Sequence, residues 1–175
     1  MSALQNAPSV DLRALFGTRG VTKATLNGTG AAATVTTTGT NTFMVDGVLY
    51  SFAAWTVQAV TVTHNMFGTP VATQAAYVQP AGTTVYYVVG LNAAGTVSVT
   101  QGSYAGQPIA AVSGVTQATT GVGGLPVVPA GVAPIGMFRV VTAGVATFTA
   151  GTTNWNATNV TPTFYDLSVL PSVAP

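Results

Sequence analysis

Residues 83–100 decide the fold class, because they contain a complete β-hairpin: Thr-Thr-Val-Tyr-Tyr-Val-Val-Gly-Leu, then Asn-Ala-Ala-Gly, then Thr-Val-Ser-Val-Thr. β-Branched and aromatic side chains fill both arms, and these residue types are enriched in strands. The four residues 92–95 supply the Asn and Gly that a short hairpin loop favours. The stretch therefore predicts two antiparallel strands, over 83–91 and 96–100.

Further strands are expected on both sides of this hairpin. Asp46-Gly47 lies between the runs 42–45 and 48–52, and Asp-Gly at such a place favours a type I′ turn. Thr142-Ala143-Gly144 separates two more strand-like runs, which predicts a third hairpin over 135–141 and 145–149. Single strands are expected at 34–38, 56–63, 71–78 and 163–170.

The composition supports the same fold class. Thr, Val, Ala and Gly make up 104 of the 175 residues. Thr and Val are stiff at χ1 and Gly costs backbone entropy, so this mixture disfavours helices. We expect an all-β protein, an antiparallel, hairpin-rich sandwich or barrel.

One short helix is predicted near the N-terminus. Ser9 is a suitable N-cap, and Gly17 is a suitable stop for a helix over residues 9–17. Leu12, Leu15 and Phe16 would then share one face. Four regions follow from these patterns: an N-terminal arm (1–30), a β region (31–102), an extended Gly/Pro-rich connection (103–134) and a C-terminal β region (135–175) that joins the first in one domain.

The chain carries very little charge. Charged residues are 4% of the sequence, against about 25% in typical soluble domains. A net charge of +1 gives no field to hold a polyanion, so nucleic acid is not an expected partner. No run of roughly 18 apolar residues is present, so no transmembrane helix and no membrane partner are expected. Residues 1–6 have neither a basic nor an apolar signal region, so no signal peptide is expected.

The scarcity of charge also argues against catalysis. His64 is the only imidazole, and a triad would need it to meet a hydroxyl and either Asp46 or Asp166, for which no motif exists. Glycan hydrolysis needs two carboxyl groups about 5–9.5 Å apart, and Asp46 is already explained by its turn. We therefore expect a non-enzymatic protein without a catalytic residue, and we expect Asp166 to form a structural ion pair with Arg139.

Metal and cofactor sites are not expected either. The chain has no Cys, which excludes disulfides and thiolate metal sites. Calcium takes about six oxygen ligands, usually with several carboxylates, and the aspartates here are scattered. Trp155 stands in a polar loop between Asn154 and Asn156, which makes it a candidate for stacking on a sugar.

The deficit of charge is itself a signal of assembly. Exposed β edges without Lys or Glu invite pairing with other chains. We expect much of the surface to be buried in a homotrimer and against a larger assembly. Contacts made by apolar burial and neutral hydrogen bonds are also largely insensitive to salt.

Four segments carry a resemblance to known proteins: residues 85–99, 125–136, 148–153 and 165–171. The most specific pieces are Pro-Ala-Gly-Val-Ala-Pro-Ile-Gly (129–136) and Tyr-Asp-Leu-Ser (165–168). Over roughly residues 41–171 the chain resembles a module that recurs in structural proteins of tailed bacteriophages, known as head decoration, head fibre or virion structural proteins. The resemblance implies a virion protein and carries no catalytic or binding residue with it.

Together these observations predict a capsid decoration or cement protein, made in the host cytoplasm and placed on the exterior of the virion capsid. Its expected partners are the major capsid protein and further copies of itself. The expected attachment residues lie in the arm: Leu12, Leu15 and Phe16 for an apolar groove, with Arg13, Arg19 and Lys23 supplying positive charge. The alternative for the helix is packing on its own domain.

Two other functions fit the sequence. A head fibre or tail adhesin would contact host surface glycans, with Trp155 as the candidate contact. A secreted bacterial glycan-binding module is the other possibility, and a signal peptide would then be expected.

Overall fold

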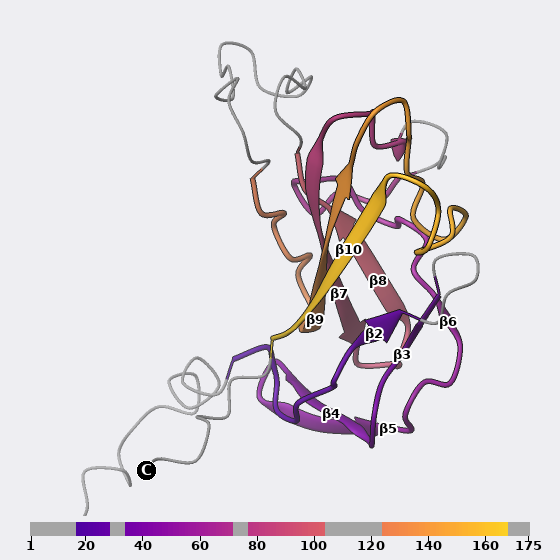
Figure 1. The fold of residues 1–175 in the computed structure, drawn as a ribbon. Helices are drawn as coiled ribbons and strands as arrows, with labels where there is room; N and C mark the ends of the chain where they lie inside the picture. Colours follow the sequence, from indigo (N-terminus) through magenta and orange to yellow (C-terminus); the bar gives the residue numbers. More distant parts are fainter. Residues whose placement is uncertain (1–16, 29–33, 72–76, 104–123, 168–175) are drawn as a thin grey trace, which may run out of the picture.

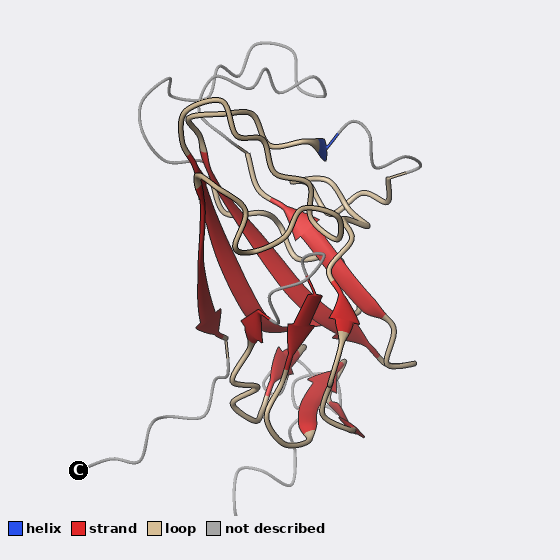
Figure 2. Ribbon diagram, turned by 45° about the vertical axis from the view of Figure 1, so that its right-hand side comes forward, coloured by secondary structure: helices blue, strands red, loops and turns tan. Residues whose placement is uncertain are grey.

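The computed structural model describes residues 17–28, 34–71, 77–103 and 124–167. This part of the chain has no α-helix and forms antiparallel sheets, so the all-β prediction is confirmed (Figure 2). The predicted helix at 9–17 lies almost wholly outside the described residues. The strands are β1 (Arg19–Gly20), β2 (Asn27–Gly28), β3 (Thr34–Thr36), β4 (Asn41–Val45), β5 (Val48–Phe52), β6 (Gln58–Ala59), β7 (Thr84–Asn92), β8 (Val97–Gln101), β9 (Val132–Thr142) and β10 (Val160–Asp166).

The largest sheet has four strands in the order β10-β9-β7-β8. Its β7–β8 hairpin confirms the prediction for residues 83–100. The Asn92 side chain accepts hydrogen bonds from the backbone N–H groups of Ala94 (3.0 Å) and Thr96 (2.9 Å), which closes the loop. Gly95 takes a φ of 77°, a value that glycine adopts without strain.

A three-stranded sheet, β1-β4-β5, lies at the lower end of the molecule in Figure 1. Asp46 and Gly47 have φ values of 50° and 79°, as a type I′ turn requires, so the predicted hairpin is confirmed. β1 lies close to β9, because a Cβ placed at Gly20 would come within 2.8 Å of the Pro134 carbonyl oxygen. A third sheet has the order β2-β3-β6.

The sheets enclose one aromatic core. Tyr87 and Phe138 stack with ring centroids 4.7 Å apart, and Trp155 meets Phe138 edge-on at 5.1 Å. Phe148 is fully buried and stacks on Trp155. The core thus joins the central strands β7 and β9 to the loop that precedes β10.

Gln79 is a fully buried polar residue in this core. Its side-chain N–H groups donate to the carbonyl oxygens of Thr83 (3.1 Å) and Val140 (3.0 Å), and its side-chain oxygen accepts from the Tyr87 hydroxyl (3.2 Å). Its backbone exchanges two hydrogen bonds with Phe148. Burial raises the pKa of Tyr87, so this phenol keeps its proton and remains a donor.

The structure corrects three predictions. The third hairpin is wrong, because β9 pairs along its length with β10, while Phe148 makes only an isolated bridge to Gln79. β9 also starts at Val132, inside the stretch predicted as an extended connection, and in the predicted strand 56–63 only Gln58–Ala59 form one. The positions of these strands depend on pairing with residues that are distant in sequence, and local sequence patterns do not identify those partners.

Candidate interaction surface

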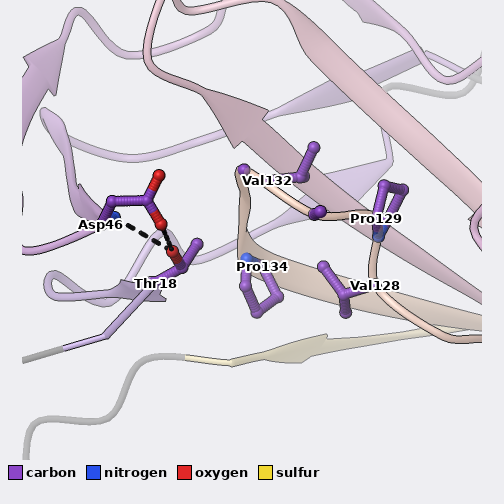
Figure 3. A pocket seen from close by; sticks show the side chains of 8 residues that line it. Thr18, Asp46, Val128, Pro129, Val132 and Pro134 are labelled. Carbon is purple, nitrogen blue, oxygen red and sulfur yellow. Dashed lines mark hydrogen bonds between the residues drawn. The ribbon is translucent and has the colours of Figure 1, made fainter. Parts of the chain in front are cut away.

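An open groove of about 460 Å³ lies at the lower end of the molecule, between the β4–β5 turn and the start of β9 (Figure 3). Most of its wall is aliphatic or proline, with one carboxylate and one hydroxyl on the opposite side. We call it the proline groove. Its lining residues are Thr18, Asp46, Val128, Pro129, Ala130, Gly131, Val132 and Pro134.

The polar side of the proline groove is built by the β4–β5 turn and the residues before β1. The Thr18 hydroxyl accepts a hydrogen bond from the backbone N–H of Asp46 (3.1 Å) and donates to the Asp46 carboxylate (3.3 Å). The Gly47 N–H donates to the Gly17 carbonyl (3.3 Å). These contacts fix residues 17 and 18 to the β4–β5 turn, at one rim of the groove.

The apolar side is built by residues 128–132 and Pro134, and residues 124–127 lead into it. Pro126 and Pro129 are buried against the body, and the Val127 N–H donates to the Met66 carbonyl (2.8 Å). The side chains on either side of Pro126 face outward: Leu125 is 64% exposed and Val127 is 56% exposed. The prolines therefore fix a segment that presents apolar side chains to solvent.

A second exposed apolar feature is strand β5. It is an edge strand, and Val48 (51%) and Leu49 (60%) are largely exposed. On the face opposite the core, Leu49 lies in one cross-strand row with Met44 and Arg19. Exposed apolar side chains on an edge strand mark a candidate contact surface.

The predicted attachment residues are only partly described. Leu12, Arg13, Leu15 and Phe16 lie outside the described residues, so their predicted role stays a prediction. Arg19 is in β1 opposite Met44. Lys23 is largely exposed, and its Nζ lies 3.8 Å from the Asp166 carboxylate.

The predicted ion pair between Arg139 and Asp166 is wrong. The β9–β10 register places Asp166 opposite Gly136 and Arg139 opposite Thr163, whose hydroxyl accepts a hydrogen bond from Arg139 (3.4 Å). Asp166 instead pairs with Lys23 and accepts a hydrogen bond from the Leu26 N–H (3.1 Å). This carboxylate therefore ties residues 23–26 to the end of β10.

The predicted sugar contact at Trp155 is also wrong. The side chain is 5% exposed, and its ring packs between those of Phe138, Phe148 and Phe164. Its indole N–H donates to the Thr34 carbonyl (2.7 Å). No face of the ring is left for a sugar to stack on.

His64 contacts two hydroxyls. Its Nδ1 lies 2.8 Å from the Thr63 Oγ1 and 2.9 Å from the Ser98 Oγ. Partial burial lowers its pKa, so the neutral imidazole is favoured at neutral pH. The Asp46 carboxylate bonds Thr18 and the Asp166 carboxylate bonds Lys23 and Leu26, so this cluster does not have the arrangement of a catalytic triad.

The described residues contain neither a cluster of metal-ligating side chains nor a helix that could span a membrane. No group of three or more His, Cys, Asp or Glu side chains in ranges 17–28, 34–71, 77–103 and 124–167 could hold a metal ion. In the same ranges, no helix is long and apolar enough to cross a bilayer.

Sequence reasoning missed the proline groove. Its wall includes Pro129–Pro134, part of the Pro-Ala-Gly-Val-Ala-Pro-Ile-Gly segment that carries the resemblance, but the other wall comes from Thr18 and Asp46, far away in the chain. Only the fold brings these two parts together. No protein-family model matches the chain, and no curated protein and no solved structure was found to be similar to it.

Proposed function

We propose that this chain is a non-enzymatic structural protein of a tailed-phage virion, a decoration or cement protein on the exterior of the head. The observation that supports the proposal best is the position of the proline groove. Its rim includes Thr18, so residues 1–16 of the arm lead into the β body beside an apolar groove. The exposed side chains of Leu125 and Val127 lie next to this groove.

These features act together as one attachment surface in the proposal. Leu12, Leu15 and Phe16 of the arm bury in the shell formed by the major capsid protein, each contributing roughly 1.5–3 kcal/mol when fully buried. Leu125 and Val127 add apolar contacts next to the groove. Arg13, Arg19 and Lys23, three of the four cations of the chain, also lie in the arm.

We propose that the chain assembles as a homotrimer. A chain with a net charge of +1 has little charge repulsion between copies, which favours association. A trimer also multiplies a weak attachment surface, because each further contact with the same head forms at high effective concentration.

Binding to heads tests the proposal. Heads of the encoding phage, purified after disruption of the gene for this chain, are incubated with the full chain or with a variant lacking residues 2–16. The full chain should bind in hundreds of copies per head, an expectation set by the number of capsid subunits. The truncated chain should lose most binding while its β-sheet circular dichroism is unchanged, because residues 17–167 contain the whole described core.

Two results would count against the proposal. One is a full chain that fails to bind heads. The other is a handful of copies per virion, located on the tail, which is the result expected for the alternative function of a tail adhesin. The burial of Trp155 removes the residue that suggested glycan contact, so no observation on the described residues favours that alternative.

A further inference from the structure

The outer edge of β5 presents backbone groups that no described residue pairs with. In the type I′ hairpin, Val45 and Val48 form a hydrogen-bonded pair, and the alternation makes Phe43–Tyr50 the next one. The N–H and C=O groups of Leu49 and Ser51 therefore point away from β4. No backbone hydrogen bond or strand pairing within the described part of the chain reaches them.

β5 also lacks the features that normally protect an edge strand. Its sequence, Val-Leu-Tyr-Ser-Phe, contains no charge and no proline, and its pairing with β4 has no bulge. Natural edge strands are usually blunted by one of these devices. β5 is the edge strand of the sheet β1-β4-β5, at the lower end of the molecule in Figure 1.

We propose that β5 pairs with β5 of a second copy of this chain, antiparallel and edge to edge, about a two-fold axis at Tyr50. In this register Leu49 of each copy faces Ser51 of the other, so all four outward-pointing backbone groups find partners. A two-fold axis needs a strand that is compatible with itself, and this strand meets that condition.

The self-compatible register and the absence of charge repulsion favour a second copy as the partner. Continuing the register beyond the strand places Asp46 opposite Ala54 of the other copy, so no like charges meet. Each copy has a net charge of only +1, which leaves little general repulsion between copies.

The pairing joins two lower sheets into one sheet of six strands. On the face opposite the core, the Leu49 side chains of the two copies would be diagonal neighbours, so that Met44 and Leu49 of both copies would lie on one face, with Arg19 at its two ends. In a homotrimer this contact joins copies of neighbouring trimers, because one two-fold axis relates two chains. The inference rests on the proposed function only in treating the lower end as an interaction surface.

Disulfide trapping tests the register, because the natural chain has no cysteine. Tyr50 of the two copies would form a non-hydrogen-bonded pair with Cα atoms about 4.5 Å apart, within the range for a disulfide. Under mild oxidation, the Tyr50→Cys chain should form covalent dimers at least ~10-fold faster than the Val145→Cys chain, because pairing raises the effective concentration of the thiols. Val145 is 92% exposed and lies outside all strands, which makes it a matched control.

A second pair of variants avoids any loss of the Tyr50 ring contact with Phe43. Mixed Leu49→Cys and Ser51→Cys chains should give the mixed dimer, whereas Ser51→Cys alone should not, because its two copies lie diagonally across the axis. Both residues are exposed, so these chains should fold.

Blocking the edge should abolish trapping. Leu49→Pro removes an outward N–H without touching the β4 pairing, and Leu49→Lys keeps the N–H and adds charge. Either change should lower the rate for Tyr50→Cys to that for Val145→Cys. The inference would be overturned if Tyr50→Cys and Val145→Cys formed dimers at equal rates and the Leu49→Cys and Ser51→Cys mixture gave no mixed dimer. Unchanged trapping of Tyr50→Cys in the presence of Leu49→Lys would also overturn it.

The two proposals can fail separately. Deleting residues 2–16 should leave trapping unchanged even though head binding is lost. If copies do not trap one another and Leu49→Lys instead weakens binding to heads, then a head protein occupies this edge and self-pairing is wrong.

Discussion

The four-stranded sheet and the lower three-stranded sheet differ in how their edge strands are protected. The outer edge of β8 is covered by residues 63–64, since the N–H groups of Thr63 and His64 both donate to the Val99 carbonyl and Gln101 donates to His64. The other edge strand, β10, contains Pro162 and Asp166. In the described part of the chain nothing pairs with the outer edge of β5, and β5 contains no proline and no charged residue. One sheet thus has protected edges, and the other has the open edge for which we propose a contact.

The two sheets also differ in how they bury side chains. Both faces of β7 and β8 are largely buried, and β9 crosses the same core. β4 instead alternates between buried and partly exposed residues, and β5 is mostly exposed. We therefore expect substitutions in the four-stranded sheet and its core to change the free energy of unfolding most, and substitutions in the lower sheet to change association.

The largest effect is expected from Trp155→Ala. The change removes an aromatic side chain that packs on three phenylalanine rings, and it removes the hydrogen bond from the indole N–H to the Thr34 carbonyl. Urea unfolding should show a loss of about 3–5 kcal/mol, as for other large-to-small core changes. Val145→Ala, at an exposed position, should stay within about 0.5 kcal/mol of the natural chain. Equal losses for the two variants would contradict the division between core and surface.

A smaller effect is expected from Asp46→Ala in the lower sheet. Asp46 adopts a φ of 50°, a conformation that costs Ala roughly 1–2 kcal/mol. The variant also lacks the hydrogen bond between the Thr18 hydroxyl and the Asp46 carboxylate. Asp46→Asn should keep most of the stability, because Asn tolerates this conformation. Urea unfolding of the two variants distinguishes the contribution of the turn conformation to stability from the contribution of the charge. A loss for Asn as large as for Ala would show that the charge matters more than the turn.

The smallest effect concerns pH and the covered edge of β8. Burial lowers the pKa of folded His64 below its ordinary 6.5, so the unfolded chain binds a proton more readily. The contribution to stability is therefore complete above pH 6.5 and declines as the pH falls through the lower pKa of the folded state. Thermal unfolding between pH 7.5 and 5 should show a small decline that is absent in His64→Gln. An identical decline in that variant would assign the effect to other groups.

The hairpins that depend on local turn residues were predictable from the sequence. Asp46-Gly47 and Asn92–Gly95 set both the loop length and the backbone conformation of their turns, so neighbouring residues determine the pairing. The all-β fold class followed from the abundance of Thr, Val and Gly for a similar reason.

The failures share one physical cause, which is pairing between distant residues. β9 meets β10 rather than the adjacent run 145–149, and this register separates Arg139 from Asp166. Trp155 has polar neighbours in sequence, but the fold turns its ring into a core with Phe138, Phe148 and Phe164, none of which is its neighbour in the local pattern. The proline groove likewise exists only because Asp46 and Pro129 meet across the fold.

The close approach of Ser103 and Gly124 has a consequence for how this protein can change over evolution or in the laboratory. The Ser103 hydroxyl accepts a hydrogen bond from the Gly124 N–H (2.9 Å), and a Cβ at Gly102 would collide with the Gly124 carbonyl oxygen. Residues 103 and 124 thus lie side by side, with residues 104–123 between them in the sequence. Doubling the length of a flexible segment between two such fixed ends costs only about 0.6 kcal/mol in closure entropy. This point is therefore a natural position for grafting foreign peptides or for gaining new sequence without altering the strands on either side.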